Sequence, residues 1–145
     1  HFPILRLLSS VVEPGERIID IGGGAGVLAL PLAQRGASVT LLEPCSAMRT
    51  LFKNRSCHLP ATDITVDHRS FQELTNRMLG HFDRIIASNV LHLLPDGFYP
   101  SLGRIFAFRP KTTVLVTEWP EEHLAPFSRS FGYYMTSHLS YTTLS

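Results

Sequence analysis

A glycine-rich loop carries the clearest chemical signal in this sequence. The loop runs Asp20-Ile21-Gly22-Gly23-Gly24-Ala25-Gly26 and follows a short β-branched segment. Glycines let the main chain turn sharply and leave space for a ligand to lie against it. Glu43 ends the next apolar segment, where a carboxylate can accept hydrogen bonds from both hydroxyls of a ribose. Loop and carboxylate together predict a site for a cofactor that contains a nucleoside.

Asp20 bears on which cofactor this is. The segment Gly24-Ala25-Gly26-Val27-Leu28-Ala29 formally matches the G-x-G-x-x-G/A pattern of dinucleotide-binding loops, so a nicotinamide cofactor stays open as an alternative. However, an Asp20 carboxylate would face the pyrophosphate that such a loop cradles, and like charges repel in a poorly solvated pocket. The acidic pair Asp20 and Glu43 instead favours a cofactor that carries positive charge, such as an ammonium and a sulfonium.

Segments with the pattern of strands alternate along the chain with segments that have the pattern of helices. Apolar, β-branched runs predict strands, and amphipathic spacing or capping residues predict helices. Gly36 marks the end of the second helix, and Pro31 inside that helix predicts a kink. Ser46 is predicted to cap the third helix. The predicted strands are 17–21, 38–43, 64–68, 82–88 and 112–118, and the predicted helices are 2–12, 25–35, 46–54, 71–79, 97–108 and 121–135.

Strand runs that are apolar almost throughout, each followed by a helix, indicate a parallel sheet that is covered on both faces. We therefore predict an α/β fold in a single domain, residues 1–145: a doubly wound, mostly parallel Rossmann-like sheet of about five strands with helices on both faces. In such sheets ligands bind beyond the carboxyl ends of the strands. The strand ends where the site is expected are therefore residues 20–26, Glu43, the segment after 64–68, residues 88–92, and Glu118 with Trp119.

Three motifs, in this order, resemble class I S-adenosylmethionine-dependent methyltransferases. Residues 19–26, Ile-Asp-Ile-Gly-Gly-Gly-Ala-Gly, resemble the D-x-G-x-G-x-G motif of that family. Residues 41–48, Leu-Leu-Glu-Pro-Cys-Ser-Ala-Met, are similar to its second-strand motif, and residues 82–96, which begin Phe-Asp-Arg-Ile-Ile-Ala-Ser-Asn, resemble its fourth-strand motif. The resemblance implies a domain that binds S-adenosylmethionine, releases S-adenosylhomocysteine and requires no metal.

The resemblance also implies roles for individual residues. Asp20 and the loop backbone would hold the methionine end of the cofactor, Glu43 would bind the ribose, and Asn89 would lie beside the methionine part and the methyl group. The cofactor-binding residues that it implies are Asp20, Gly22, Gly23, Gly24, Gly26, Glu43, Pro44, Cys45, Ser70, Phe71 and Asn89.

The expected adenine contacts include one departure from the family pattern. Pro44 and Cys45 would lie beside the adenine. Ser70 stands where the family usually has an acidic residue, so a carboxylate contact to the adenine amino group is missing at that position. Phe71 would pack on the ring, with a core position as the alternative.

His92, just beyond the fourth predicted strand, is the candidate catalytic residue. Methyl transfer is an in-line displacement in which the protein mainly aligns the reactants and excludes water, so a base helps only when the acceptor must lose a proton. An imidazole titrates near neutral pH and suits that task. The alternative is that His92 is a polar residue in a turn.

Charge and composition narrow the expected partners and location. There are 13 Lys and Arg against 12 Asp and Glu, a formal net charge of +1, whereas a nucleic-acid binder normally shows a basic excess. Residues 89–92, Asn-Val-Leu-His, also lack the N/D-P-P-Y/F motif of related enzymes that methylate base amino groups. We expect a small-molecule substrate and no nucleic acid.

Three features of the sequence bear on the location of the protein. No apolar run reaches the ~20 residues of a membrane span, and no signal-peptide pattern opens the chain. Two cysteines are too few for a disulfide framework. These features indicate the cytoplasm.

Family members usually carry additions to the core that the resemblance covers. We expect an N-terminal lid and C-terminal antiparallel strands to lie outside residues 1–145. The edge of the fifth strand would then pair with a second copy of the chain or with the rest of a longer one. Beside a small-molecule methyltransferase, two other functions stay open: a nicotinamide-dependent oxidoreductase, and a non-catalytic module that binds the cofactor or keeps only the fold.

Overall fold

The computed structural model describes residues 2–107 and 112–116. The strands are β1 (Arg17–Ile21), β2 (Ser38–Leu42), β3 (Ile64–Asp67), β4 (Arg84–Ser88) and β5 (Thr112–Val116). The helices are α1 (Phe2–Val11), α2 (Ala29–Gln34), α3 (Ser46–Ser56), α4 (Asn76–Leu79) and α5 (Phe98–Ala107), with short 3-10 turns at Phe71–Glu73 and Leu91–Leu93. In this described part, no helix combines the length and the apolar character needed to cross a membrane. The predicted helix 121–135 and the end of the predicted fifth strand lie outside the described residues.

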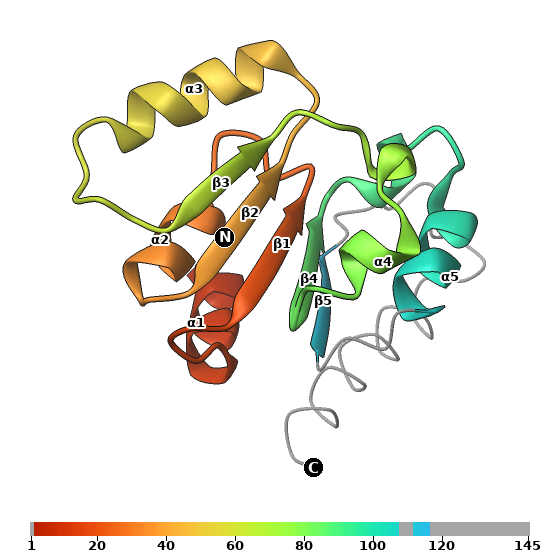
Figure 1. Ribbon diagram of the computed structural model, residues 1–145, viewed down its shortest axis with the longest axis horizontal. Helices are drawn as coiled ribbons and strands as arrows, with labels where there is room; N and C mark the ends of the chain where they lie inside the picture. Colours follow the sequence, from red (N-terminus) through yellow and green to blue (C-terminus); the bar gives the residue numbers. More distant parts are fainter. Residues whose placement is uncertain (1, 108–111, 117–145) are drawn as a thin grey trace.

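The strands form one sheet in the order β3-β2-β1-β4-β5, and each neighbouring pair is parallel. Figure 1 shows how the chain winds outward from β1 through β2 to β3, returns to the other side of β1 as β4, and continues to β5. The winding therefore reverses between β1 and β4, at the kind of switch point where doubly wound sheets bind ligands. The predicted doubly wound α/β fold is confirmed.

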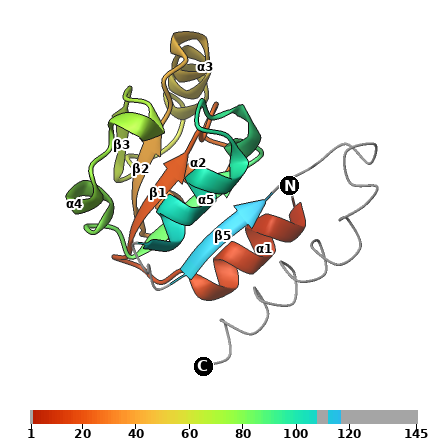
Figure 2. The same ribbon diagram turned by 90° about the vertical axis from the view of Figure 1, so that its right-hand side faces the viewer.

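Side chains of the central strands point alternately into two separate cores. On one face, Ile18 and Leu41 join a cluster with residues of α1 and α2 and with Phe52 of α3. On the other face, Ile19 and Ile85 join a cluster with residues of α4, α5 and the turn after β4. Figure 2 shows α1 and α5 on opposite sides of β5. Helices cover both faces of the sheet, as predicted.

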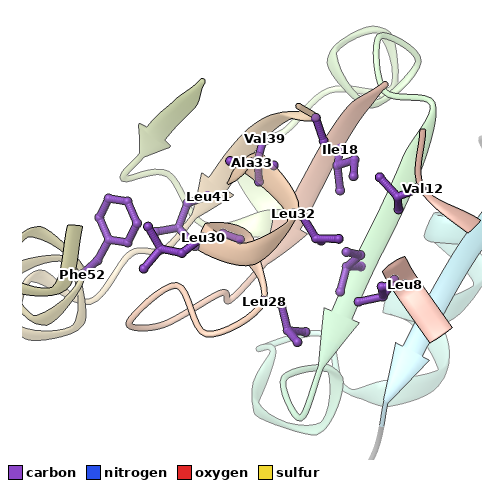
Figure 3. Packing of buried hydrophobic residues seen from close by; sticks show 13 residues of the cluster. Leu8, Val12, Ile18, Leu28, Leu30, Leu32, Ala33, Val39, Leu41 and Phe52 are labelled. Carbon is purple, nitrogen blue, oxygen red and sulfur yellow. The ribbon is translucent and has the colours of Figure 1, made fainter. Parts of the chain in front are cut away.

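Helix α2 is the central element of the first core (Figure 3). Leu30 lies toward Phe52 of α3, and Leu32 lies on the side of α1, near Leu8. Leu32 and Leu8 are fully buried, and Leu30 is 4% exposed. Because burying one such side chain contributes about 1.5–3 kcal/mol, these contacts hold α2 firmly on the sheet. They also fix the end of the glycine loop, which leads directly into α2.

The prediction that the second helix begins at residue 25 and kinks at Pro31 was wrong. The helix begins at Ala29, so Pro31 lies in its first turn, where a missing N–H leaves no intrahelical bond unmade. Residues 25–28 therefore lengthen the loop that precedes the helix. The predicted stop is confirmed: Gly36 has φ +95°, and the Ala37 N–H donates to the Leu32 carbonyl at 3.3 Å, a Schellman ending.

Two other predicted helix boundaries also differ from the structure. The N-cap of α3 is Cys45, and Ser46 is the first helical residue. The predicted helix 71–79 is divided into a 3-10 turn and α4, because Thr75 starts a new helix: its hydroxyl oxygen accepts a hydrogen bond from the Met78 N–H at 3.3 Å. Both boundaries depend on local hydrogen bonds that periodicity alone does not reveal.

A buried ion pair links the start of β4 to the turn before β1, at the amino edge of the sheet. Arg84, at the start of β4, donates from Nη2 to the Glu16 Oε1 oxygen at 2.9 Å and also from Nε to Oε2. Both residues are only 8% exposed. Glu16 also accepts a hydrogen bond from the Glu13 N–H at 3.0 Å, so the pair fixes the turn that leads into β1. Each charge is buried at the expense of its hydration and depends on the other.

Replacing Glu16 by alanine should lower the free energy of unfolding by about 3 kcal/mol, because it leaves the Arg84 guanidinium buried without its carboxylate. Denaturant unfolding measures the loss. The matched control is Arg17→Met, which removes the exposed side-chain pair of Arg17 with Asp83 at the same edge and should cost much less. Similar losses for the two variants would contradict the structural importance of the buried pair.

Candidate functional site

A pocket of about 170 Å³ opens at the carboxyl edge of the sheet, between the ends of β1 and β4. The glycine loop forms one wall, and the first residues after β4 form another. The pocket lies at the switch point of the sheet, where a ligand is expected. In the described part of the chain, its lining consists of Asp20, Gly22, Gly23, Gly24, Ala25, Val27, Leu28, Ser88 and Asn89.

The loop needs glycine for two different physical reasons. Gly22 has φ +62°, and a Cβ there would overlap the Val90 side chain. Gly26 has φ +74°, and a Cβ there would lie 2.5 Å from the ring of Phe52. Side-chain-bearing residues rarely adopt such φ values, and neither position has room for one. The loop is therefore a main-chain cradle packed tightly between β4 and α3.

Asp20 is a buried carboxyl group at the end of β1. It is 1% exposed, and its Oδ2 oxygen has no hydrogen-bond partner within the described structure. Burial, and secondly the negative charge of Glu43, raise the pKa of Asp20 to about 7. An uncompensated buried carboxylate is costly, whereas a cation beside it would compensate the charge. Asp20 is thus suited to receive a positively charged group of a ligand.

Glu43 connects the glycine loop to the turn between β2 and α3. Its side chain is buried, and its two oxygens accept hydrogen bonds from different N–H groups: Gly24 at 2.9 Å and Cys45 at 2.8 Å. An ionised carboxylate offers about four lone-pair sites, so each oxygen keeps capacity for a ligand hydroxyl. The bond to Gly24 was not foreseen from the sequence, and it brings the carboxylate to the cofactor loop itself.

Asn89 follows β4 and lines the pocket together with Ser88. Its φ of +54° is the only positive value at a non-glycine residue in the described part. Asparagine tolerates this left-handed conformation better than most residues. The backbone therefore turns sharply at the end of β4, and this turn shapes the part of the pocket wall that Ser88 and Asn89 form.

The structure does not bring Ser70 and Phe71 to the pocket. The Ser70 hydroxyl donates to the Glu73 carboxylate at 2.8 Å. Phe71 is 2% exposed and belongs to the second core, with the Arg104 guanidinium 4.7 Å from the centre of its ring. Its position is that of a core residue, which was the alternative interpretation. A ring in this position has no open face for a ligand.

Other predicted residues lie outside the pocket lining or have no described side chain. Pro44 and Cys45 are exposed at the turn that Glu43 supports. His92 lies in the 3-10 turn Leu91–Leu93, directly after the residues that line the pocket; only its backbone is described. Glu118 and Trp119, where the fifth predicted strand ends, lie outside the described residues.

Sequence reasoning missed part of the lining. Val27 and Leu28 were assigned to the helix, and they line the pocket because α2 begins only at Ala29. Pro31 carried the signal that could have found them, because proline is favoured in the first turn of a helix. Ser88, by contrast, stood at a predicted strand end and was among the residues 88–92 where the site was expected.

The comparisons with known proteins agree with this geometry. The family model of a domain described as "Methyltransferase domain" matches residues 3–142. This chain belongs to that family. The resemblance to class I methyltransferases that the sequence motifs indicated is thereby confirmed, and the family membership disfavours a nicotinamide-dependent oxidoreductase.

Two bacterial enzymes are among the curated relatives of this methyltransferase domain. A stretch of 84 residues is 32% identical to the ubiquinone biosynthesis O-methyltransferase of Pseudomonas aeruginosa (strain LESB58), and covers 57% of this chain and 35% of that protein. A stretch of 95 residues is 32% identical to the enzyme of the same name from Xanthomonas axonopodis pv. citri (strain 306), and covers 63% and 38%. The aligned part of the chain thus spans little more than a third of each relative's length.

Two solved structures with the same fold are methyltransferases by name. The magnesium protoporphyrin IX methyltransferase from Synechocystis PCC 6803 with bound SAM has a TM-score of 0.61 at 22% identity, over 74% of this chain and 51% of that one. Coclaurine N-methyltransferase bound to N-methylheliamine and SAH has a TM-score of 0.61 at 20% identity, over 74% and 32%. These likenesses support the Rossmann-like methyltransferase fold.

The conformation of Asn89 predicts an unusual order of stabilities. Asn89→Gly should be more stable than Asn89→Ala by about 1 kcal/mol, because alanine strains the left-handed backbone and glycine does not. Denaturant unfolding of both variants measures the difference. At Ser88, in the extended strand β4, the order should reverse, because glycine is unfavourable there. Alanine being the better residue at both positions would contradict the assigned conformation.

The raised pKa of Asp20 predicts a pH-dependent stability. Its pKa of about 7 in the folded state lies above the ordinary aspartate value of 3.8, so the folded state holds a proton that the unfolded chain releases. This contribution is fully present below pH ~4 and is lost as the pH rises through ~7. The free energy of unfolding of Asp20→Asn should therefore rise relative to the wild type over that range. Asp63→Asn, at an exposed position, should show no such trend, and a pH-independent difference for Asp20→Asn would contradict the prediction.

Proposed function

We propose that this chain binds S-adenosylmethionine and transfers its methyl group to a small-molecule acceptor. The observation that carries the proposal is the pair of buried carboxyl groups, Asp20 and Glu43, at two adjacent strand ends around a glycine-lined pocket. The unpartnered Oδ2 of Asp20 fits an ammonium group, and the Glu43 oxygens fit ribose hydroxyls. Family membership supports the same assignment.

Different residues at the site would bind different parts of the cofactor. Asp20 and the backbone of Gly22, Gly23, Gly24 and Gly26 would hold its methionine end, and Glu43 its ribose. Pro44 and Cys45 would border the adenine, and Asn89 the methionine and methyl side. When bound, S-adenosylmethionine supplies a methyl group activated by a sulfonium. The chain's own contribution is to bind, to orient and to exclude water from the pocket.

His92 is the proposed base for an acceptor that must lose a proton. Its backbone lies in the 3-10 turn Leu91–Leu93, shortly after Asn89, which lines the pocket. A neutral imidazole can take a proton near physiological pH. The assignment rests on residue type and position in the chain.

The acceptor is proposed to be a small molecule and not a nucleic acid. The relatives are named for small-molecule products and substrates, ubiquinone and magnesium protoporphyrin IX among them. The net charge of +1 supports the same choice.

A cytoplasmic location is proposed on the sequence features alone. In the described sheet β5 has a neighbour on one side only, and we propose that its other edge pairs with a second copy or with further parts of a longer protein.

Calorimetric titration with S-adenosylhomocysteine and, separately, with NAD tests the proposed cofactor. The first should bind in the micromolar range and the second should not bind. Asp20→Asn and Glu43→Gln should each weaken S-adenosylhomocysteine binding by about tenfold or more, the size expected for charge-assisted hydrogen bonds. Asp63→Asn, at the amino end of β3, is the matched control and should bind normally.

The remaining outcomes separate the alternatives. Tight binding of NAD would overturn the proposal in favour of an oxidoreductase. Binding of neither ligand would favour a module that keeps only the fold. Binding of S-adenosylmethionine without methyl transfer to any small-molecule acceptor offered would favour a non-catalytic cofactor-binding module.

A further inference from the structure

Arg49 donates hydrogen bonds to the main chain of the turn that carries Glu43. Its Nη1 group donates to the carbonyl oxygen of Glu43 at 2.9 Å and to that of Pro44 at 2.6 Å. Both acceptors lie in the short connection between β2 and α3, and Arg49 lies in the first turns of α3. A single guanidinium therefore cross-links the beginning of a helix to the residues that precede it.

The position of this arginine is electrostatically unfavourable for the helix itself. The N-terminus of a helix carries partial positive charge, so a cation in the first turn destabilises the helix, and acidic residues are preferred there. The first turn of α3 contains no acidic residue. Two charge-assisted hydrogen bonds to carbonyl oxygens offset this cost. The feature that Arg49 stabilises is thus the turn and not the helix.

Two side chains of opposite charge, Glu43 and Arg49, hydrogen-bond to the main chain of the turn between β2 and α3. The Glu43 carboxylate accepts hydrogen bonds from the N–H groups of Gly24 and Cys45. The Arg49 guanidinium donates to the carbonyl oxygens of Glu43 and Pro44. The main chain of Glu43 is therefore restrained by Arg49, and its side chain is aimed at the glycine loop. A change in the main chain would turn the carboxylate away from Gly24.

We propose that Arg49 is a positioning residue for the ribose-binding carboxylate: it holds the Glu43–Cys45 turn in the conformation in which Glu43 faces the glycine loop. The inference rests on the proposed function, and it adds a residue outside the pocket lining and outside the motifs that predicted the site. Arg49 acts through Glu43, so its loss should weaken binding of the nucleoside half of the cofactor. The methionine half, which depends on Asp20, should be unaffected.

Calorimetry with two ligands distinguishes binding of the nucleoside half of the cofactor from binding of its methionine half. S-Adenosylhomocysteine carries the amino-acid end, whereas 5′-methylthioadenosine has the nucleoside and lacks that end. Arg49→Met should weaken both ligands by the same factor, about tenfold, because a misplaced Glu43 carboxylate loses its charge-assisted hydrogen bonds to the ribose. Asp20→Asn should weaken S-adenosylhomocysteine alone. Arg55→Met removes an exposed positive charge from the last turn of the same helix and should leave both affinities unchanged.

Rescue by a conservative variant distinguishes positioning from general destabilisation. Arg49→Lys should recover most of the lost affinity for both ligands, because an ammonium can also donate to two carbonyl oxygens. If Arg49→Met does not fold, as circular dichroism would show, Arg49→Gln carries the same test with the same expected loss.

Three results would overturn the inference: normal binding by Arg49→Met, a loss confined to S-adenosylhomocysteine, or a lysine variant as weak as the methionine one. Each leaves the proposed function standing if the unaltered chain binds S-adenosylhomocysteine. Failure of the unaltered chain to bind either ligand would overturn the proposed function and this inference together.

Discussion

The Glu43 carboxylate ties together the two loops on which the candidate site depends. One oxygen accepts from the Gly24 N–H in the loop after β1, and the other accepts from the Cys45 N–H in the turn after β2. Parallel pairing of β1 with β2 brings these two strand ends side by side. The far end of the glycine loop is fixed by α2, which is packed into the first core. The cradle is thus held by one buried carboxylate at one end and by hydrophobic packing at the other.

Buried ionisable groups are balanced differently at the amino and carboxyl edges of the sheet. At the amino edge, Glu16 is matched by Arg84, and the pair closes the turn into β1. At the carboxyl edge, Asp20 is buried even more completely, but its Oδ2 oxygen has no partner in the described structure and its pKa is raised to about 7. Burial of an unmatched carboxyl group costs stability. Such a cost is typical of a binding site, where a ligand supplies the missing partner.

Several parts of the fold and site were predictable because they depend on local patterns. Asp20, Glu43 and Asn89 each end or follow a strand, and a parallel sheet places such residues at one edge, so their proximity followed from strand order alone. Phe71 was not assignable in this way. An aromatic residue after a strand has the same pattern whether it faces a ligand or the core, and its neighbours, Arg104 among them, come from distant parts of the chain.

The amino-acid sequence by itself determined the order of strands and helices, the parallel sheet, and the chemical character of the site. These follow from residue type and spacing, which act over a few neighbouring positions. Only the tertiary structure decided that Glu43 bonds to Gly24, that Val27 and Leu28 line the pocket, and that Arg49 grips the turn at Glu43 and Pro44. Those contacts depend on where packing places segments far apart in the chain and on hydrogen bonds at helix ends, which no periodicity encodes.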